Sequence, residues 1–139
     1  IDDWLHWDRN LSEGTVGGDA WIRQMHQHGV LTAGDTIPYA FGLVHGDHRG
    51  LATVSHGGAW VGFRAAMSRY PSADRSFVAL CNRADADPTG LLLEVAEVYL
   101  NDQMDADRRR RKTCRRPLCS RAGHVERHAQ TACTAVLHR

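Results

Sequence analysis

One short segment, residues 55–64, combines the residue types from which a ligand site on a β-strand can be made. Within it, His56 directly precedes the adjacent glycines Gly57 and Gly58. Two residues without Cβ atoms allow the backbone of a ligand to approach a strand closely. A histidine beside them can hydrogen-bond to whatever binds there. The alternative is structural: a β-bulge or turn next to a histidine whose hydrogen bonds are satisfied within the fold.

The surrounding periodicity predicts the elements that must position this segment. Apolar spacings of three and four residues indicate helices, and alternation indicates strands. The predicted elements are helices over residues 4–11 and 19–29, strands over 37–44, 51–55, 63–70 and 76–82, turns over 45–50 and 71–74, and a helix that begins at Asp87-Pro88. The strand over 76–82 is apolar almost throughout, which predicts cover on both faces. The predicted fold class is α+β, an antiparallel β-meander with packed helices.

This order of elements resembles the C-terminal part of the serine β-lactamase-like hydrolases. That family includes class C β-lactamases, D-alanyl-D-alanine carboxypeptidases, and related esterases and peptidases. The resemblance covers about residues 1–102 and rests on ordered motifs rather than on one triplet. These motifs are Trp7-Asp8-Arg9, Tyr39 to Leu43, His56-Gly57-Gly58, Gly62-Phe63-Arg64, Arg69-Tyr70-Pro71, Asn82 at a strand end, and Asp87-Pro88. The resemblance implies a β-lactamase/transpeptidase-like fold.

The resemblance also implies roles for individual residues. His56-Gly57-Gly58 is similar to the family's third motif, Lys-Thr-Gly or His-x-Gly. His56 would then help to bind substrate and act at the catalytic centre, and Gly57 and Gly58 would belong to the substrate-binding strand. Ala59 matches the residue whose backbone N–H is one of the two oxyanion donors. Such a donor contributes about 3–4 kcal/mol of transition-state stabilisation.

The catalytic motifs that should precede this strand are absent from the chain. The family's nucleophile lies in Ser-x-x-Lys, but the only Lys is Lys112, and Arg109 stands three places before it. Tyr-x-Asn is matched once, at Tyr99-Leu100-Asn101, after the triplet instead of before it. We therefore interpret Tyr99 as core packing. Because the chain starts at Ile1 within a predicted helix, we expect a missing upstream segment that supplies both motifs.

Charge divides the chain into two segments. Residues 1–104, the expected hydrolase part, carry seven Arg, no Lys and thirteen acidic residues, a net charge of −6. Residues 105–139 carry ten basic and three acidic residues, a net charge of +7, together with three of the four cysteines. A segment of this composition without periodicity predicts a disordered basic tail outside the domain. A phosphate-binding arm and translation in the wrong frame of a GC-rich gene are the alternatives.

No metal or other cofactor is predicted. The His pair of the tail has zinc-finger spacing, but its distance from Cys119 to His124 is too short for a finger. His26 and His28 are expected to point apart on a helix, and His45 and His48 to lie solvated on a turn. With Cys81 alone in the first segment, no disulfide framework is expected. No apolar run of about 18 residues predicts a membrane span, and the localisation stays open.

Two functions of different classes follow. The first is the C-terminal fragment of a serine hydrolase that acts through an acyl-enzyme on amide, ester or β-lactam substrates, and that is inactive without its nucleophile. Its partner is a small-molecule or peptide substrate. The second is a noncatalytic binding module that keeps the sheet and lacks the serine. The fragment is also expected to expose apolar surface and to be poorly soluble.

Overall fold

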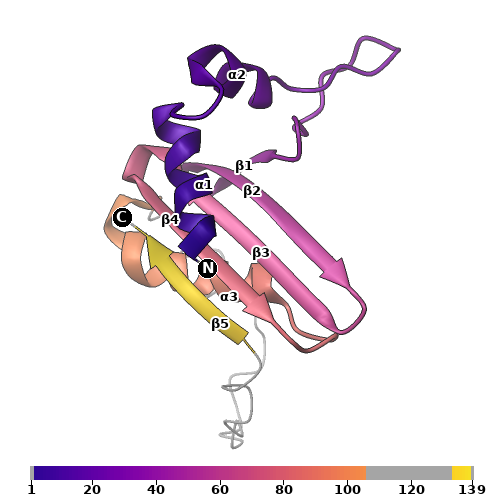
Figure 1. The fold of residues 1–139 in the computed structure, drawn as a ribbon. Coiled ribbons are helices and arrows are strands. Elements are labelled where there is room, and N and C mark those ends of the chain that lie inside the picture. The colour runs from indigo at the N-terminus through magenta and orange to yellow at the C-terminus, as the bar shows by residue number, and fades with distance from the viewer. Residues whose placement is uncertain (1, 106–132, 139) are drawn as a thin grey trace, which may run out of the picture.

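A computed structural model describes residues 2–105 and 133–138, and confirms the α+β class (Figure 1). The helices are α1 (Asp2–Glu13), α2 (Gly18–Met25) and α3 (Pro88–Leu100), and the strands are β1 (Val44–His48), β2 (Leu51–Trp60), β3 (Phe63–Tyr70), β4 (Arg75–Cys81) and β5 (Cys133–His138). All neighbouring strands run antiparallel, in the order β1-β2-β3-β4-β5. The sheet is thus a meander of five strands, one more than the periodicity predicted.

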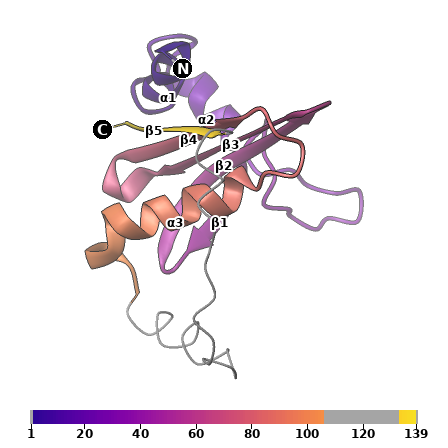
Figure 2. The same cartoon turned by 90° about the horizontal axis from the view of Figure 1, so that it is seen from below.

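The sheet has a helix on each face (Figure 2). On one face α3 packs on β3 and β4, and Tyr70, Phe77 and Leu92 are fully buried there. On the other face α1 contributes Leu11 to a second cluster, in which Trp4 and Trp7 are partly buried. Because side chains alternate across a strand, consecutive residues of β3 and β4 enter different clusters.

Three predicted elements are confirmed where their signals are local. β3 spans the expected residues, and a 3-10 turn over Pro71–Ala73 leads into β4. At the start of α3, Asp87 caps the helix, since its Oδ1 accepts a hydrogen bond of 2.9 Å from the Gly90 N–H. Pro88 at the first helical position has no N–H to leave unpaired.

The strand predicted over residues 37–44 is wrong. This segment bonds to the loop before it, where the Gly29 N–H donates to the Tyr39 carbonyl at 2.8 Å. The strand in this region is β1, which covers most of the turn predicted over residues 45–50. Only Arg49 and Gly50 form the hairpin loop between β1 and β2. Both loop residues have positive φ, 54° and 87°, as a two-residue hairpin loop that follows the sheet twist requires.

His48 is buried, not solvated. Its Nδ1 lies 2.7 Å from the Tyr70 hydroxyl, and its Nε2 lies 3.4 Å from a Glu97 carboxylate oxygen. Arg49 reaches the same carboxylate at 3.3 Å. Burial raises the pKa of the Tyr70 hydroxyl. The group connects the β1-β2 hairpin to α3, a long-range arrangement that local periodicity cannot reveal.

The expected boundary after residue 104 is wrong for residues 133–138. These residues form β5, which pairs with β4 along its length, and Cys133 forms a disulfide with Cys81. The expectation of no disulfide is therefore also wrong, because the strand register places the two cysteines opposite each other. The basic run, Cys119 and the predicted His pair lie outside the described residues. A disulfide-bonded Cys133 has no thiolate to offer a metal.

A buried ion pair fastens α1 to the sheet. Arg69 of β3 donates from Nη1 to the Asp8 carboxylate at 2.7 Å, and both residues are buried, at 7% and 2% exposure. The Ser76 hydroxyl of β4 donates to the other Asp8 oxygen at 2.6 Å. Arg69 Nη2 also donates to the Ser12 hydroxyl of α1. The helix thereby has one defined position over β3 and β4.

Candidate functional site

The second half of β2 has an open margin, which we define as the side of residues 56–60 that faces away from β3. β1 pairs with β2 only from Leu51 to Ser55. β3 pairs with β2 from Val54 to Trp60 without interruption. Within the described strands, residues 56–60 therefore have a neighbour on one side only. The predicted end of this strand at Ser55 is wrong, because β2 continues through Gly57 and Gly58 to Trp60.

The register shows which backbone groups point toward this margin. The His45 N–H donates away from β2, to the Pro38 carbonyl at 2.8 Å, so the pair His45 and Val54 is a non-hydrogen-bonded pair of the β1-β2 ladder. The N–H and C=O groups of Val54 therefore point to β3. With no bulge in the register, the direction alternates residue by residue, and the groups of Gly57 and Ala59 point to the open margin.

The fold itself does not require glycine at positions 57 and 58. Neither residue has a positive φ. A Cβ added at Gly57 would meet its nearest atom, the Ala65 carbonyl oxygen, at 3.8 Å, and one at Gly58 would meet the Ala65 Cβ at 3.7 Å. Both distances are ordinary van der Waals contacts. The absence of side chains here thus leaves space for something outside the described residues.

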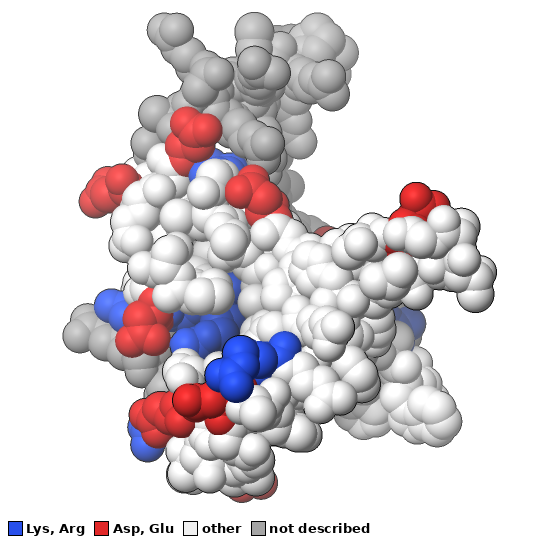
Figure 3. All heavy atoms as spheres, turned by 90° about the horizontal axis from the view of Figure 1, so that it is seen from above, with Lys and Arg blue, Asp and Glu red and all other residues white. Residues whose placement is uncertain are grey.

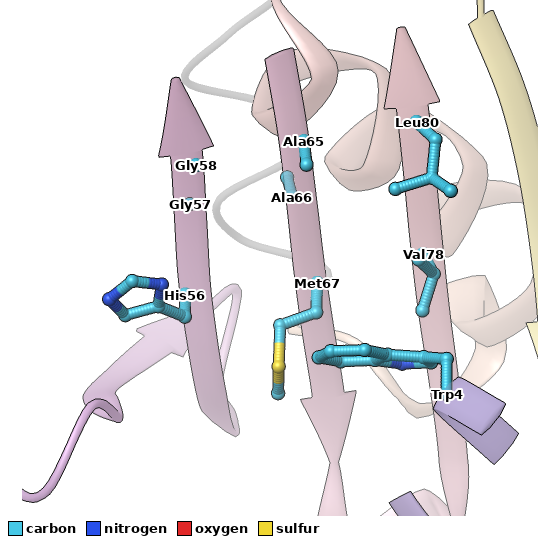
Figure 4. A pocket seen from close by; sticks show the side chains of 9 residues that line it. All are labelled: Trp4, His56, Gly57, Gly58, Ala65, Ala66, Met67, Val78 and Leu80. Atoms are coloured by element: carbon cyan, nitrogen blue, oxygen red, sulfur yellow. The ribbon is translucent and has the colours of Figure 1, made fainter. Parts of the chain in front are cut away.

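His56 lies at this margin and is exposed. Its imidazole is directed away from β3 (Figure 4), and its Nε2 lies 3.5 Å from the Tyr39 hydroxyl. Tyr39 belongs to the loop before β1, and sequence reasoning assigned it no role beside His56. No spacing rule connects the two residues, because the loop that brings them together was predicted as a strand.

Beside the margin, the face of the sheet that carries α1 is hollowed. The hollow has a volume of about 230 Å³ and is lined by Trp4, His56, Gly57, Gly58, Ala65, Ala66, Met67, Val78 and Leu80 (Figure 4). Leu80 is 45% exposed, so β4 is not covered on both faces along its whole length as expected. We call this hollow the trough. It joins His56 and the glycines to an apolar surface.

Charged side chains of both signs lie on the side of the molecule that Figure 3 shows. Acidic and basic side chains lie beside each other in Figure 3, and uncharged residues make up most of the described surface in that view. Tyr99 is 59% exposed on α3, and its ring centroid lies 6.2 Å from that of Phe77. The interpretation of Tyr99 as core packing is therefore wrong.

Three histidines gather near the N-terminal end of β1. His26 follows the last residue of α2, and its Nδ1 lies 3.4 Å from His45 Nε2. The His28 ring also contacts His45, with centroids 4.7 Å apart. The expectation that His26 and His28 point apart is wrong, because α2 ends at Met25. Among the described residues, no group of His, Cys, Asp and Glu is arranged to hold a metal ion.

Acidification is expected to weaken this part of the fold. Burial lowers the pKa of His26 and His45 below the ordinary 6.5, and neighbouring charge lowers both further. Protons then bind the unfolded chain more readily, so stability is retained above pH 6.5 and falls as the pH drops below it. Urea midpoints between neutral pH and about pH 5 measure the loss. His45→Gln should flatten this pH dependence, whereas His6→Gln on the exposed side of α1 should leave it unchanged.

Comparison with protein-family models, curated proteins and solved structures finds no match to this chain. None of the helices in residues 2–105 is both long enough and apolar enough to cross a membrane. The site is therefore defined by its own geometry: an open strand margin with two outward backbone N–H groups, a histidine beside it, and an adjoining apolar trough.

Proposed function

We propose that this chain is the C-terminal part of a serine β-lactamase-like hydrolase that acts through an acyl-enzyme. One observation carries the proposal. β1 stops pairing at Ser55, so residues 56–60 keep one side open to receive a substrate. Had α1 or α3 covered this margin, an acyl group could not lie along β2.

The backbone directions support the role proposed for Ala59. Its N–H points to the margin and can donate to the carbonyl oxygen of a bound ester or amide. When a serine oxygen attacks the carbonyl carbon, negative charge develops on that oxygen, and a donor already in place stabilises it. The alcohol or amine then leaves, and water hydrolyses the acyl-serine. The serine must come from polypeptide outside these 139 residues, because Ser-x-x-Lys is absent from them.

The proposed roles of His56 and the glycines rest on the same geometry. The imidazole reaches past the margin and can hydrogen-bond to a carbonyl or carboxylate of the substrate. The Tyr39 hydroxyl at 3.5 Å restricts the ring orientation. Gly57 and Gly58 carry no side chain that would hold a substrate away from the strand.

The missing nucleophile favours a second function, a noncatalytic binding module with the same margin. The hydrolase and the binding module are distinguished by adding p-nitrophenyl acetate to the protein that contains this chain and its natural flanking sequence. An enzyme releases p-nitrophenol and acquires an acetyl group on a serine, which mass spectrometry detects. A protein that binds the ester but releases no p-nitrophenol and acquires no acetyl group would overturn the hydrolase proposal and establish the binding module.

In that intact protein, His56→Ala is expected to lower kcat about tenfold to a hundredfold, because the ring hydrogen-bonds to substrate without holding the fold together. His56 is exposed, and the Tyr39 hydroxyl is the one hydrogen-bond partner found for its ring among the described residues. The thermal midpoint should therefore stay close to that of the unmodified protein. His6→Ala, an exposed histidine on α1, is the matched control. Unchanged kcat in His56→Ala would remove the role of His56.

A further inference from the structure

We propose that the trough binds the uncharged, apolar acyl group of the substrate. This inference rests on the proposed function and names its substrate class: esters and amides of straight or lightly branched apolar acids. The trough starts at the open margin, beside the backbone groups that would hold the reacting carbonyl. An acyl chain attached to that carbonyl can therefore continue from the margin onto the sheet.

The floor of the trough is a row of uncharged residues across three strands. Gly58 of β2 pairs with Ala65 of β3, and Ala65 pairs with Leu80 of β4, so their side-chain positions share one face. Two strand spacings of about 4.8 Å make this row about 10 Å long. Met67 and Val78 pair in the neighbouring row, and the Trp4 ring lies over them (Figure 4).

The lining favours an uncharged occupant. His56 is the one ionisable residue of the lining, and its imidazole lies at the margin rather than on the floor. The basic side chain nearest along this face of β3 is Arg69, which already bonds Asp8, Ser12 and Ser76. A carboxylate at the end of the acyl chain away from His56 would thus lose its hydration without gaining a described partner. Apolar carbon, in contrast, is stabilised by leaving water.

Gly58 is the entrance to the trough. A side chain at this position would point onto the same face as Ala65 and would stand between the margin and the floor. The protein's own atoms leave room for a Cβ at position 58, so packing within the fold does not require a glycine there. An acyl chain that passes over this position does require one. Gly58→Leu should close this path while leaving the backbone groups of Gly57 and Ala59 unchanged.

The three methionines of the chain allow a test that does not depend on catalysis. Met67 lines the trough, and Met104 is buried in the cluster on the other face of the sheet. Met25 is buried in the same cluster as Met67 but is not part of the lining. The chain with ¹³C-labelled methionine methyl groups is titrated with methyl hexanoate. We expect a saturable shift of the Met67 signal alone. Monomethyl adipate, of similar length but with a terminal carboxylate, should bind about tenfold more weakly.

Two variants define the ends of the trough. Gly58→Leu should weaken methyl hexanoate binding at least about tenfold, and Gly62→Leu, a glycine with open space around it, is the control. Leu80→Lys places an ammonium at the far end and should reverse the preference toward monomethyl adipate. Leu80 is half-exposed, so this variant should fold even if Gly58→Leu does not.

Equal binding of the two esters, a similar shift of all three methionines, or no shift of Met67 would overturn the inference. A failure of this inference can be distinguished from a failure of the proposed function. A protein that binds methyl hexanoate in the trough but never forms an acyl-serine contradicts the hydrolase proposal only. A protein that forms an acyl-serine but shows no shift of the Met67 methyl signal contradicts only the assignment of the trough.

Discussion

Replacing Asp8 by Ala is expected to lower the free energy of unfolding by about 3–5 kcal/mol, because it leaves the buried Arg69 guanidinium with only the exposed Asp74 carboxylate, 3.5 Å away, as a charged partner among the described residues. Asp8 is 2% exposed and accepts hydrogen bonds from Arg69 at 2.7 Å and from Ser76 at 2.6 Å. Breaking one partner of a buried pair costs more than the pair contributes as a whole. Urea unfolding of the 139-residue chain, followed by tryptophan fluorescence, measures the change.

The double variant Asp8→Ala/Arg69→Met separates this cost from simple loss of contacts. Removing both charges should recover part of the stability, since no unpaired charge is then buried. Asp3→Ala on the exposed side of the same helix should change stability by only a few tenths of a kcal/mol. A loss for Asp8→Ala no larger than that for Asp3→Ala would show that the ion pair does not hold α1 on the sheet.

The second prediction compares proline at two adjacent positions of β2. Ala59→Pro removes an N–H that points to the open margin, so it should change the stability of the chain by less than about 1 kcal/mol. Gly58→Pro removes an N–H that bonds to β3 and should cost about 3 kcal/mol. In the intact protein, the oxyanion role proposed for the Ala59 N–H predicts that Ala59→Pro lowers kcat about a hundredfold to a thousandfold.

Each measurement tests a different step. The stability difference between the two proline variants tests the register of β2 and the outward direction of the Ala59 N–H. The kinetic effect tests whether that N–H faces the reacting carbonyl. If Ala59→Pro unfolds the chain while Gly58→Pro does not, the register is shifted by one residue. If Ala59→Pro folds and retains full kcat, the oxyanion role is refuted and the margin serves binding alone.

Elements with strong local signals could be predicted from the sequence. The Asp87-Pro88 cap carries its own hydrogen bond to Gly90, and the turn between β3 and β4 begins with Pro71. These signals act within four residues, so no distant partner is needed to express them. The segment around Tyr39 shows the opposite. Its alternation is that of a strand, yet its backbone hydrogen bonds run to Gly29 of the preceding loop and to His45 near the start of β1.

The candidate site was predicted in part. His56, Gly57, Gly58 and Ala59, which the motif singled out, lie on β2, and this strand continues past the glycines to Trp60. Their roles stay predictions. The Tyr39 contact and the trough were not predicted. Both depend on which strands are neighbours and on how far β1 extends, and neither quantity is encoded in the spacing of the motif.

The amino-acid sequence alone determined the α+β class, the meander of β2 to β4, the capped helix α3, and the residues of the strand motif. These follow from backbone preferences and from periodicity over short windows. The tertiary structure decided that the first residue of β1 lies opposite Ser55 and that β5 joins the sheet. It also decided that Asp8 contacts Arg69, 61 positions away in the chain. The physical reason is that strand pairing and burial of charge are settled by contacts between distant segments, whose free energies outweigh local preference.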